Sequence, residues 1–78
     1  MKEIKVLGPG CSKCKKLADN VSKAIEQLPD EPDFEYVTDM QKIIEAGIMM
    51  TPALIIDGKV VSTGKALPVK DIVKLFNS

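Results

Sequence analysis

The sequence GPGCSKC, at residues 8–14, marks a change in the residue pattern of the chain. Before it, residues 4–7 are mostly apolar, which predicts a short β-strand that ends at the Gly-Pro-Gly turn. After it, apolar residues recur every three or four positions from Cys11 to Leu28, which predicts an amphipathic helix of about four turns. The stretch therefore joins a first strand to a first helix and places Cys11 at the start of that helix.

The rest of the chain carries signals for two more helices and three more strands. We expect a strand at 34–38, a short helix capped by Asp39, a buried strand at 53–56, a turn at Asp57-Gly58, a return strand at 59–63 and a last helix from Pro68. The predicted order is βαβαββα. Parallel strands around the first helix and a terminal hairpin give an α/β fold, with one four-stranded mixed sheet and helices on both faces.

Length and composition predict one small domain covering residues 1–78. The 78 residues are 45% apolar and 28% charged, and eleven basic side chains balance eleven acidic ones. This balance favours neither nucleic acid nor an anionic membrane as a partner. The longest uncharged stretch, residues 46–56, is shorter than the roughly 18 to 20 residues of a membrane helix. Charge at residues 2–5 argues against a secretory signal, so we expect a cytoplasmic protein.

The two cysteines, Cys11 and Cys14, carry the chemistry of the sequence. A disulfide between them closes too short a loop to stabilise the fold much. The chain has no histidine, which excludes Cys-His and Ser-His-Asp catalysis and removes the commonest zinc ligand. In a cytosolic protein, a CxxC pair indicates catalysis, redox sensing or metal binding. We expect no zinc site, because tetrahedral zinc needs four ligands and the chain offers two thiols.

The two thiols are expected to have different roles. Cys11 lies where helix N–H groups and the helix dipole favour a thiolate, and the charge of Lys13 adds a screened contribution. Cys14 lies on the apolar stripe, where burial raises the pKa of a thiol. Thiol-disulfide exchange needs this division, with Cys11 attacking a substrate disulfide and Cys14 resolving the mixed disulfide. The alternative that both are incidental small core residues does not explain their place after Gly-Pro-Gly.

Two other functions use the same two thiolates. One is a soft-metal carrier, since two thiolates before a helix also suit Cu(I). Met40, Met49 and Met50 could add thioether ligands, but we expect them to fill gaps in the core, as methionines commonly do. The other is a redox-sensing module whose disulfide controls a partner. An insulin-reduction assay separates an enzyme from the metal carrier, whereas no sequence feature separates it from the sensor.

Over essentially its whole length, the chain resembles the small thioredoxin-like, glutaredoxin-sized redox-active disulfide proteins of archaea and bacteria. The resemblance rests on residues 8–14, on Met-Thr-Pro-Ala at 50–53, and on Asp-Gly at 57–58 followed by Gly-Lys-Ala-Leu at 64–67. It implies a thioredoxin-like fold and a cis Pro52 across from Cys11. It also implies that the Thr51 backbone pairs with substrate and that Gly64 leaves room beside the disulfide. The alternatives are a trans proline that limits the strand and a plain loop glycine.

Departures from the family pattern concern the resolving thiol and glutathione. Thioredoxins have a buried aspartate six residues before the first cysteine, which assists the resolving thiol, whereas this chain has Lys5 there. The glutathione-binding signature of glutaredoxins is present only as Pro52 and one glycine, so glutathione use is not supported.

These features together predict a dithiol-disulfide oxidoreductase that reduces protein disulfides. The redox-active disulfide Cys11-Cys14 is its working group, and no bound cofactor or metal is expected. The resemblance implies disulfide-containing protein substrates and a separate reductase of the flavin type as electron donor. We expect a monomer.

Overall fold

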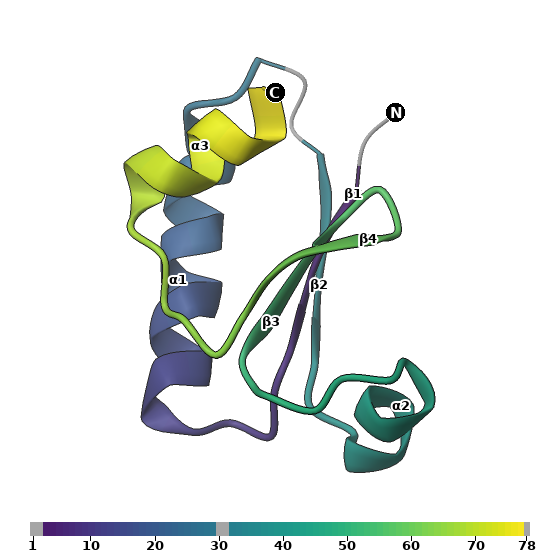
Figure 1. The fold of residues 1–78 in the computed structure, drawn as a ribbon. Coiled ribbons are helices and arrows are strands. Elements are labelled where there is room, and N and C mark those ends of the chain that lie inside the picture. Colours follow the sequence, from purple (N-terminus) through teal and green to yellow (C-terminus); the bar gives the residue numbers. More distant parts are fainter. Residues whose placement is uncertain (1–2, 30–31, 78) are drawn as a thin grey trace.

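The computed structural model describes residues 3–29 and 32–77, and its elements follow the predicted order βαβαββα (Figure 1). They are β1 (Glu3–Leu7), α1 (Ser12–Glu26), β2 (Asp33–Val37), α2 (Met40–Glu45), β3 (Ala53–Ile56), β4 (Lys59–Thr63) and α3 (Val69–Asn77). The loop expected between α1 and β2 lies partly outside the described residues.

The four strands form one mixed sheet in the order β2-β1-β3-β4. β1 pairs with β2 in parallel and with β3 antiparallel, so that Val6 lies between Tyr36 and Leu54. β3 and β4 form the predicted hairpin, and its turn residues Asp57 and Gly58 have φ values of 52° and 81°. Positive φ at both central residues is the geometry that Asp-Gly favours in a two-residue turn. The predicted four-stranded mixed sheet is confirmed.

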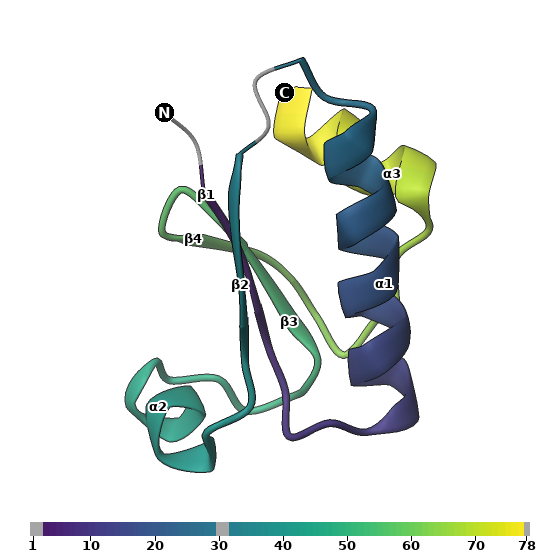
Figure 2. The same ribbon diagram turned by 180° about the vertical axis from the view of Figure 1, so that it is seen from behind.

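The helices cover both faces of this sheet. α1 and α3 lie together on one face, and α2 lies near one end of the other (Figures 1 and 2). The larger buried cluster fills the α1 side and comprises Ile4, Val6, Leu17, Val21, Ala24, Leu28, Leu54, Ile56, Ile72 and Phe76. Leu7, Ile43 and Ala53 form a smaller cluster on the α2 side. Because successive side chains of a strand point to opposite faces, β1 supplies both clusters.

α1 carries the predicted apolar stripe but ends before the pattern does. Its buried residues are Cys14, Leu17, Ala18, Val21 and Ala24. The helix ends at Glu26, and the N–H groups of Gln27 and Leu28 donate to the Ala24 and Ile25 carbonyls, each at 3.0 Å. These bonds span three residues, so the chain leaves the helix through a tighter turn. Leu28 is buried beyond the helix end, which explains why it continues the apolar pattern.

Asp39, Gly47 and Pro68 lie at the ends of the shorter helices. The Asp39 carboxylate accepts a hydrogen bond from Gln41 N at 2.9 Å and begins α2, as predicted. Gly47, with φ of 76°, follows the end of this helix. Pro68 precedes α3, and its carbonyl accepts the N–H of Ile72 at 3.2 Å. Within the described ranges, no helix has the length and apolar character needed to cross a membrane.

The three methionines expected in the core are exposed instead. Met40 is 50% exposed, Met50 62% and Met49 95%. α2 has only six residues and buries Ile43 alone, so Met40 lies off its inward face, while Met49 and Met50 lie in the loop between α2 and β3. The prediction that these methionines fill gaps in the core is therefore wrong.

Candidate active site

Cys11 is the N-cap residue of α1. Its backbone is extended, with φ of −69° and ψ of 170°, and its carbonyl accepts the N–H of Lys15 at 2.9 Å. Its Sγ takes the place of the usual capping oxygen and accepts the N–H of Cys14 at 3.3 Å. The first N–H groups of a helix carry partial positive charge, so this position stabilises a sulfur anion. The sulfur is exposed at the helix start, where the sequence predicted it.

The surroundings of Cys11 lower the pKa of its thiol. The largest cause is the hydrogen bond with the Cys14 side chain, and the Cys14 backbone N–H is next. Desolvation opposes these effects, and the backbone N–H of Lys13 makes a smaller contribution that lowers the pKa. More of Cys11 is therefore thiolate at neutral pH than of a free cysteine.

Cys14 has the opposite environment. Its side chain is buried, with 0% exposed. Burial raises the pKa of the Cys14 thiol, and the hydrogen bond with Cys11 raises it further. Both cysteines are free thiols in this structure. An accessible sulfur that ionises readily thus lies one helical turn from a buried sulfur that holds its proton, which is the division expected from the sequence.

Gly8 makes room for the buried sulfur, although the sequence pattern predicted only a turn residue there. A Cβ on Gly8 would overlap Cys14 Sγ and would lie 3.0 Å from Cys14 Cβ. It would also lie 3.7 Å from Pro52 Cα. The alternation of side chains along β1 could have predicted this role. Ile4 and Val6 face α1, and Gly8 is the next position on that face. A glycine at a core-facing position just before a CxxC motif indicates that another group fills the space where its side chain would be.

Pro52 lies beside the space that Gly8 leaves for the Cys14 sulfur. The Thr51-Pro52 peptide bond is cis, as the resemblance implied. The Pro52 side chain is fully buried, and Thr51 is partly buried. The approach of Pro52 Cα to Gly8 brings the start of β3 to the end of β1, next to Cys14. The contact of the Thr51 backbone with substrate stays a prediction.

Gly64 adjoins the same segment. Its N–H donates to the Pro52 carbonyl at 2.8 Å, and its φ is 71°, a value that favours glycine. A Cβ on Gly64 would lie 3.0 Å from Met50 Cε, and the other atoms that it would approach also belong to Met50. The structure therefore places Gly64 against the Pro52 loop, while its role beside the disulfide stays a prediction.

The alkylation of Cys11 is expected to outpace that of Cys14 and to rise at lower pH than that of a free cysteine. Because its pKa is lowered, the Cys11 thiol stays ionised at lower pH than a free cysteine, and it should therefore react faster near neutral pH. Iodoacetamide rates measured against pH, with peptide mapping by mass, check this. As a control, Lys13→Glu should raise the pKa of Cys11 only slightly, because the exposed charge is screened and the backbone N–H remains. Faster alkylation of Cys14 would contradict the assignment.

The described residues hold no group of three or more His, Cys, Asp or Glu side chains placed to bind a metal ion. The two sulfurs are the pair of reactive groups that the site brings together. Two thiols placed in this way can supply two electrons in an exchange between a dithiol and a disulfide.

Comparison with known proteins agrees with this site. The family model of the thioredoxin domain matches residues 2–77. A thioredoxin of Methanothermobacter thermautotrophicus is 31% identical over 77 residues, which cover 99% of this chain and 100% of the relative. A thioredoxin of Methanocaldococcus jannaschii is 36% identical over 69 residues, which cover 88% of this chain and 79% of the relative. The chain therefore belongs to the thioredoxin family, whose members are thiol-disulfide oxidoreductases.

Proposed function

We propose that this protein reduces disulfide bonds in protein substrates, with Cys11 as the attacking thiol and Cys14 as the resolving thiol. The observation that carries the proposal is the capping sulfur of Cys11, which is exposed and accepts the Cys14 N–H at 3.3 Å. The second sulfur is buried one turn further along the same helix. The pair needs no bound cofactor, because the two thiols themselves supply the electrons.

The reaction has two exchange steps. The Cys11 thiolate attacks one sulfur of the substrate disulfide, and the other substrate sulfur leaves as a thiolate that takes up a proton. Cys14 then loses its proton and attacks Cys11 Sγ, which breaks the mixed disulfide and releases the second substrate sulfur as a thiol. The substrate gains two electrons and two protons, and the protein is left with a Cys11-Cys14 disulfide.

The substrate groove in this proposal includes Thr51, Pro52 and Gly64. Pro52 lies next to the pocket of Cys14, and Gly64 N donates to its carbonyl at 2.8 Å. These contacts support a groove in which the Thr51 backbone pairs with an extended substrate segment, as the resemblance implies. Lys13 would border the groove from the exposed side of α1.

The proposed cycle also needs an electron donor. A separate disulfide reductase, of the flavin type in related systems, would return the Cys11-Cys14 disulfide to the dithiol. A compartment that keeps thiols reduced, such as the cytosol, suits a protein that works from its dithiol state. We propose that one domain, acting as a monomer, suffices for the reaction, because one sulfur caps α1 and the other lies in its first turn.

Insulin reduction tests the proposal against Cu(I) transport. With dithiothreitol as electron source, the wild-type protein should accelerate the precipitation of reduced insulin chains well above the rate with dithiothreitol alone. Cys11→Ser should give only the background rate, because it lacks the attacking thiolate. A wild-type protein that binds Cu(I) with submicromolar affinity and fails to reduce insulin would contradict the proposal and favour the carrier.

A further inference from the structure

Tyr36 contains a buried polar atom. Its hydroxyl oxygen is buried and makes no hydrogen bond with any residue that the structure describes. Buried tyrosine hydroxyls usually find a partner, because leaving one unpaired costs free energy. A group that is left unpaired in the dithiol state is therefore available to a partner that appears in another state.

The sheet register places Tyr36 on the sheet face that α1 covers, near the end of β1 that leads to the two cysteines. Tyr36 pairs with Val6 and packs against the cluster between the sheet and α1. The carbonyl of the next residue, Val37, accepts the N–H of Gly8 at 2.9 Å. Gly8 is the residue whose missing side chain leaves room for Cys14 Sγ. Tyr36 and Cys14 therefore approach the same corner of the core, one from β2 and one from α1.

Electrostatics agree with this placement. Burial raises the pKa of Tyr36, and negative charge on Cys14 raises it further, with a smaller contribution from Cys11. The hydroxyl thus keeps its proton at neutral pH and can donate it in a hydrogen bond. A thiolate is an acceptor for such a donor, and hydrogen bonds to charged groups are stronger than those to neutral ones.

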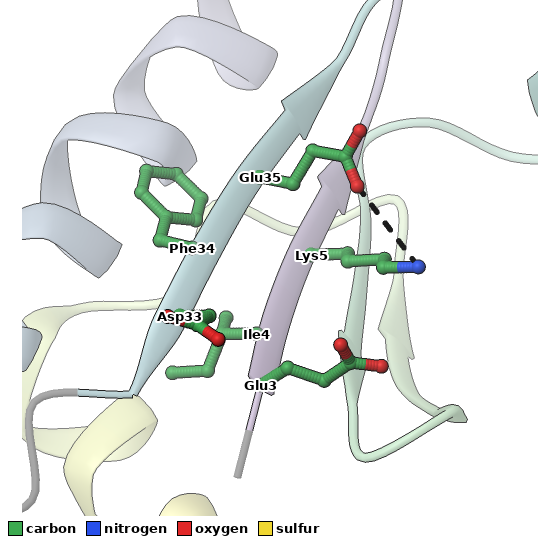
Figure 3. Close-up of a pocket in the computed structure, with 6 residues that line it drawn as sticks. All are labelled: Glu3, Ile4, Lys5, Asp33, Phe34 and Glu35. Carbon is green, nitrogen blue, oxygen red and sulfur yellow. Dashed lines mark ion pairs between the residues drawn. The ribbon is translucent and has the colours of Figure 1, made fainter. Parts of the chain in front are cut away.

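Among the described residues, Cys11 is the one other titratable side chain that shifts the pKa of Cys14. Figure 3 shows Lys5 and Glu35 on the sheet face opposite to Ile4 and Phe34, with an ion pair of 4.0 Å between them. Lys5 stands where the resemblance would put an assisting aspartate, and its side chain points away from α1. The lysines of the first turns of α1 are exposed, and none of the charged residues of α3 shifts the pKa of Cys14. These residues are Lys13, Lys15 and Lys16 in α1, and Lys70, Asp71 and Lys74 in α3.

We propose that the Tyr36 hydroxyl donates a hydrogen bond to the Cys14 sulfur when Cys14 becomes a thiolate and resolves the mixed disulfide. This inference rests on the proposed function. The proton of Cys14 passes to solvent, its sulfur forms the bond to Cys11 Sγ, and the bond between Cys11 and the substrate sulfur breaks. Tyr36 keeps its own proton throughout. It is a positioning residue that stabilises the resolving thiolate, a role that the family pattern gives to a carboxylate.

The test is the titration of Cys14 with and without the hydroxyl. In a Cys11→Ser background, Cys14 is the single thiol, and its ¹³Cβ chemical shift reports its ionisation. Tyr36→Phe keeps the ring and should raise the pKa of Cys14 by about 1 to 2, as expected for the loss of one hydrogen bond to a charged group. Phe34→Leu, on the same face of β2, is the matched control and should leave this pKa unchanged. Equal titration of Cys14 in the Tyr36→Phe and parent proteins would overturn the inference, as would an equal shift in the control.

A reciprocal measurement does not depend on the Tyr36→Phe variant. Tyr36 is the chain's one tyrosine, so the near-ultraviolet absorbance of its phenolate follows it alone. Replacing Cys14 by Ser in the Cys11→Ser background removes the thiolate and should lower the pKa of Tyr36. An unchanged Tyr36 titration would contradict the contact.

Kinetics separate this inference from the proposed function. With both cysteines present, Tyr36→Phe should slow the resolution of a preformed mixed disulfide about three- to tenfold at pH values below the pKa of Cys14, because the thiolate is rarer although each thiolate is a better nucleophile. The slowing should disappear or reverse at higher pH, where Cys14 is ionised in both proteins. A uniform slowing at every pH would instead indicate a structural role and would contradict the inference. If the wild type itself fails to reduce insulin, the proposed function is wrong, while the two titrations still report whether Tyr36 contacts Cys14.

Discussion

Cys14→Ser protein is expected to accumulate as a covalent adduct with its disulfide substrate. The exposed Cys11 thiolate can still attack, because its place at the helix start is retained. Without the second sulfur, the mixed disulfide has no internal group to break it. Turnover should fall to the background rate, and intact mass under non-reducing conditions should show the chain joined to one substrate chain.

The matched control is Cys11→Ser, which keeps the buried thiol and loses the exposed one. It should form no adduct, because Cys14 has 0% of its surface exposed and a raised pKa. Adduct formation through Cys14, or full turnover in either variant, would contradict the assigned roles. The same adduct, purified from cells that produce Cys14→Ser, would identify the physiological substrate.

Gly8→Ala is expected to destabilise the protein and to suppress its activity. The new Cβ would overlap Cys14 Sγ, so either the sulfur or the end of β1 must move. Overpacking of this kind costs about 1 to 3 kcal/mol, and a displaced sulfur resolves the mixed disulfide poorly. Urea denaturation of the reduced protein measures the first effect, and insulin reduction measures the second.

A double-mutant cycle separates this clash from a general intolerance of alanine at position 8. Cys14→Ala removes the sulfur, so Gly8→Ala should cost less free energy of unfolding in that background than in the wild type. Some cost should persist, because Cys14 Cβ would still lie 3.0 Å from the new Cβ. Equal costs in the two backgrounds would show that Gly8 does not act through the sulfur.

The element order was predictable because each element carries a local signal. The apolar spacing of α1 identifies all five of its buried residues. Asp57-Gly58 is a strong turn signal, and both residues have positive φ values in the structure. Element ends were less predictable. Leu28 belongs to the apolar pattern because the core buries it, although the helix ends at Glu26. Apolar periodicity reports burial, and burial continues past the last helical residue.

The reactive pair was predictable from the sequence, but its supporting residues were not. Gly8 resembles a turn residue because Pro9 and Gly10 follow it, and its constraint comes from a sulfur six positions later. The unpaired hydroxyl of Tyr36 depends on the strand register and on the position of α1, which no local pattern encodes. Met49 lies in the loop between α2 and β3 and is exposed despite the apolar character of methionine. Tertiary contacts decide all three cases.

The mass of the chain after one reaction with insulin tests the central claim most directly. Reduced wild-type protein, mixed with insulin in the absence of other reductants and then quenched with acid, should be recovered as a monomer lighter by two hydrogen atoms. Peptide mapping should place the new disulfide between Cys11 and Cys14, with insulin disulfides reduced in equal amount. Recovery of the unchanged dithiol, or of a disulfide-linked dimer as the main oxidised species, would contradict dithiol-disulfide exchange by this pair.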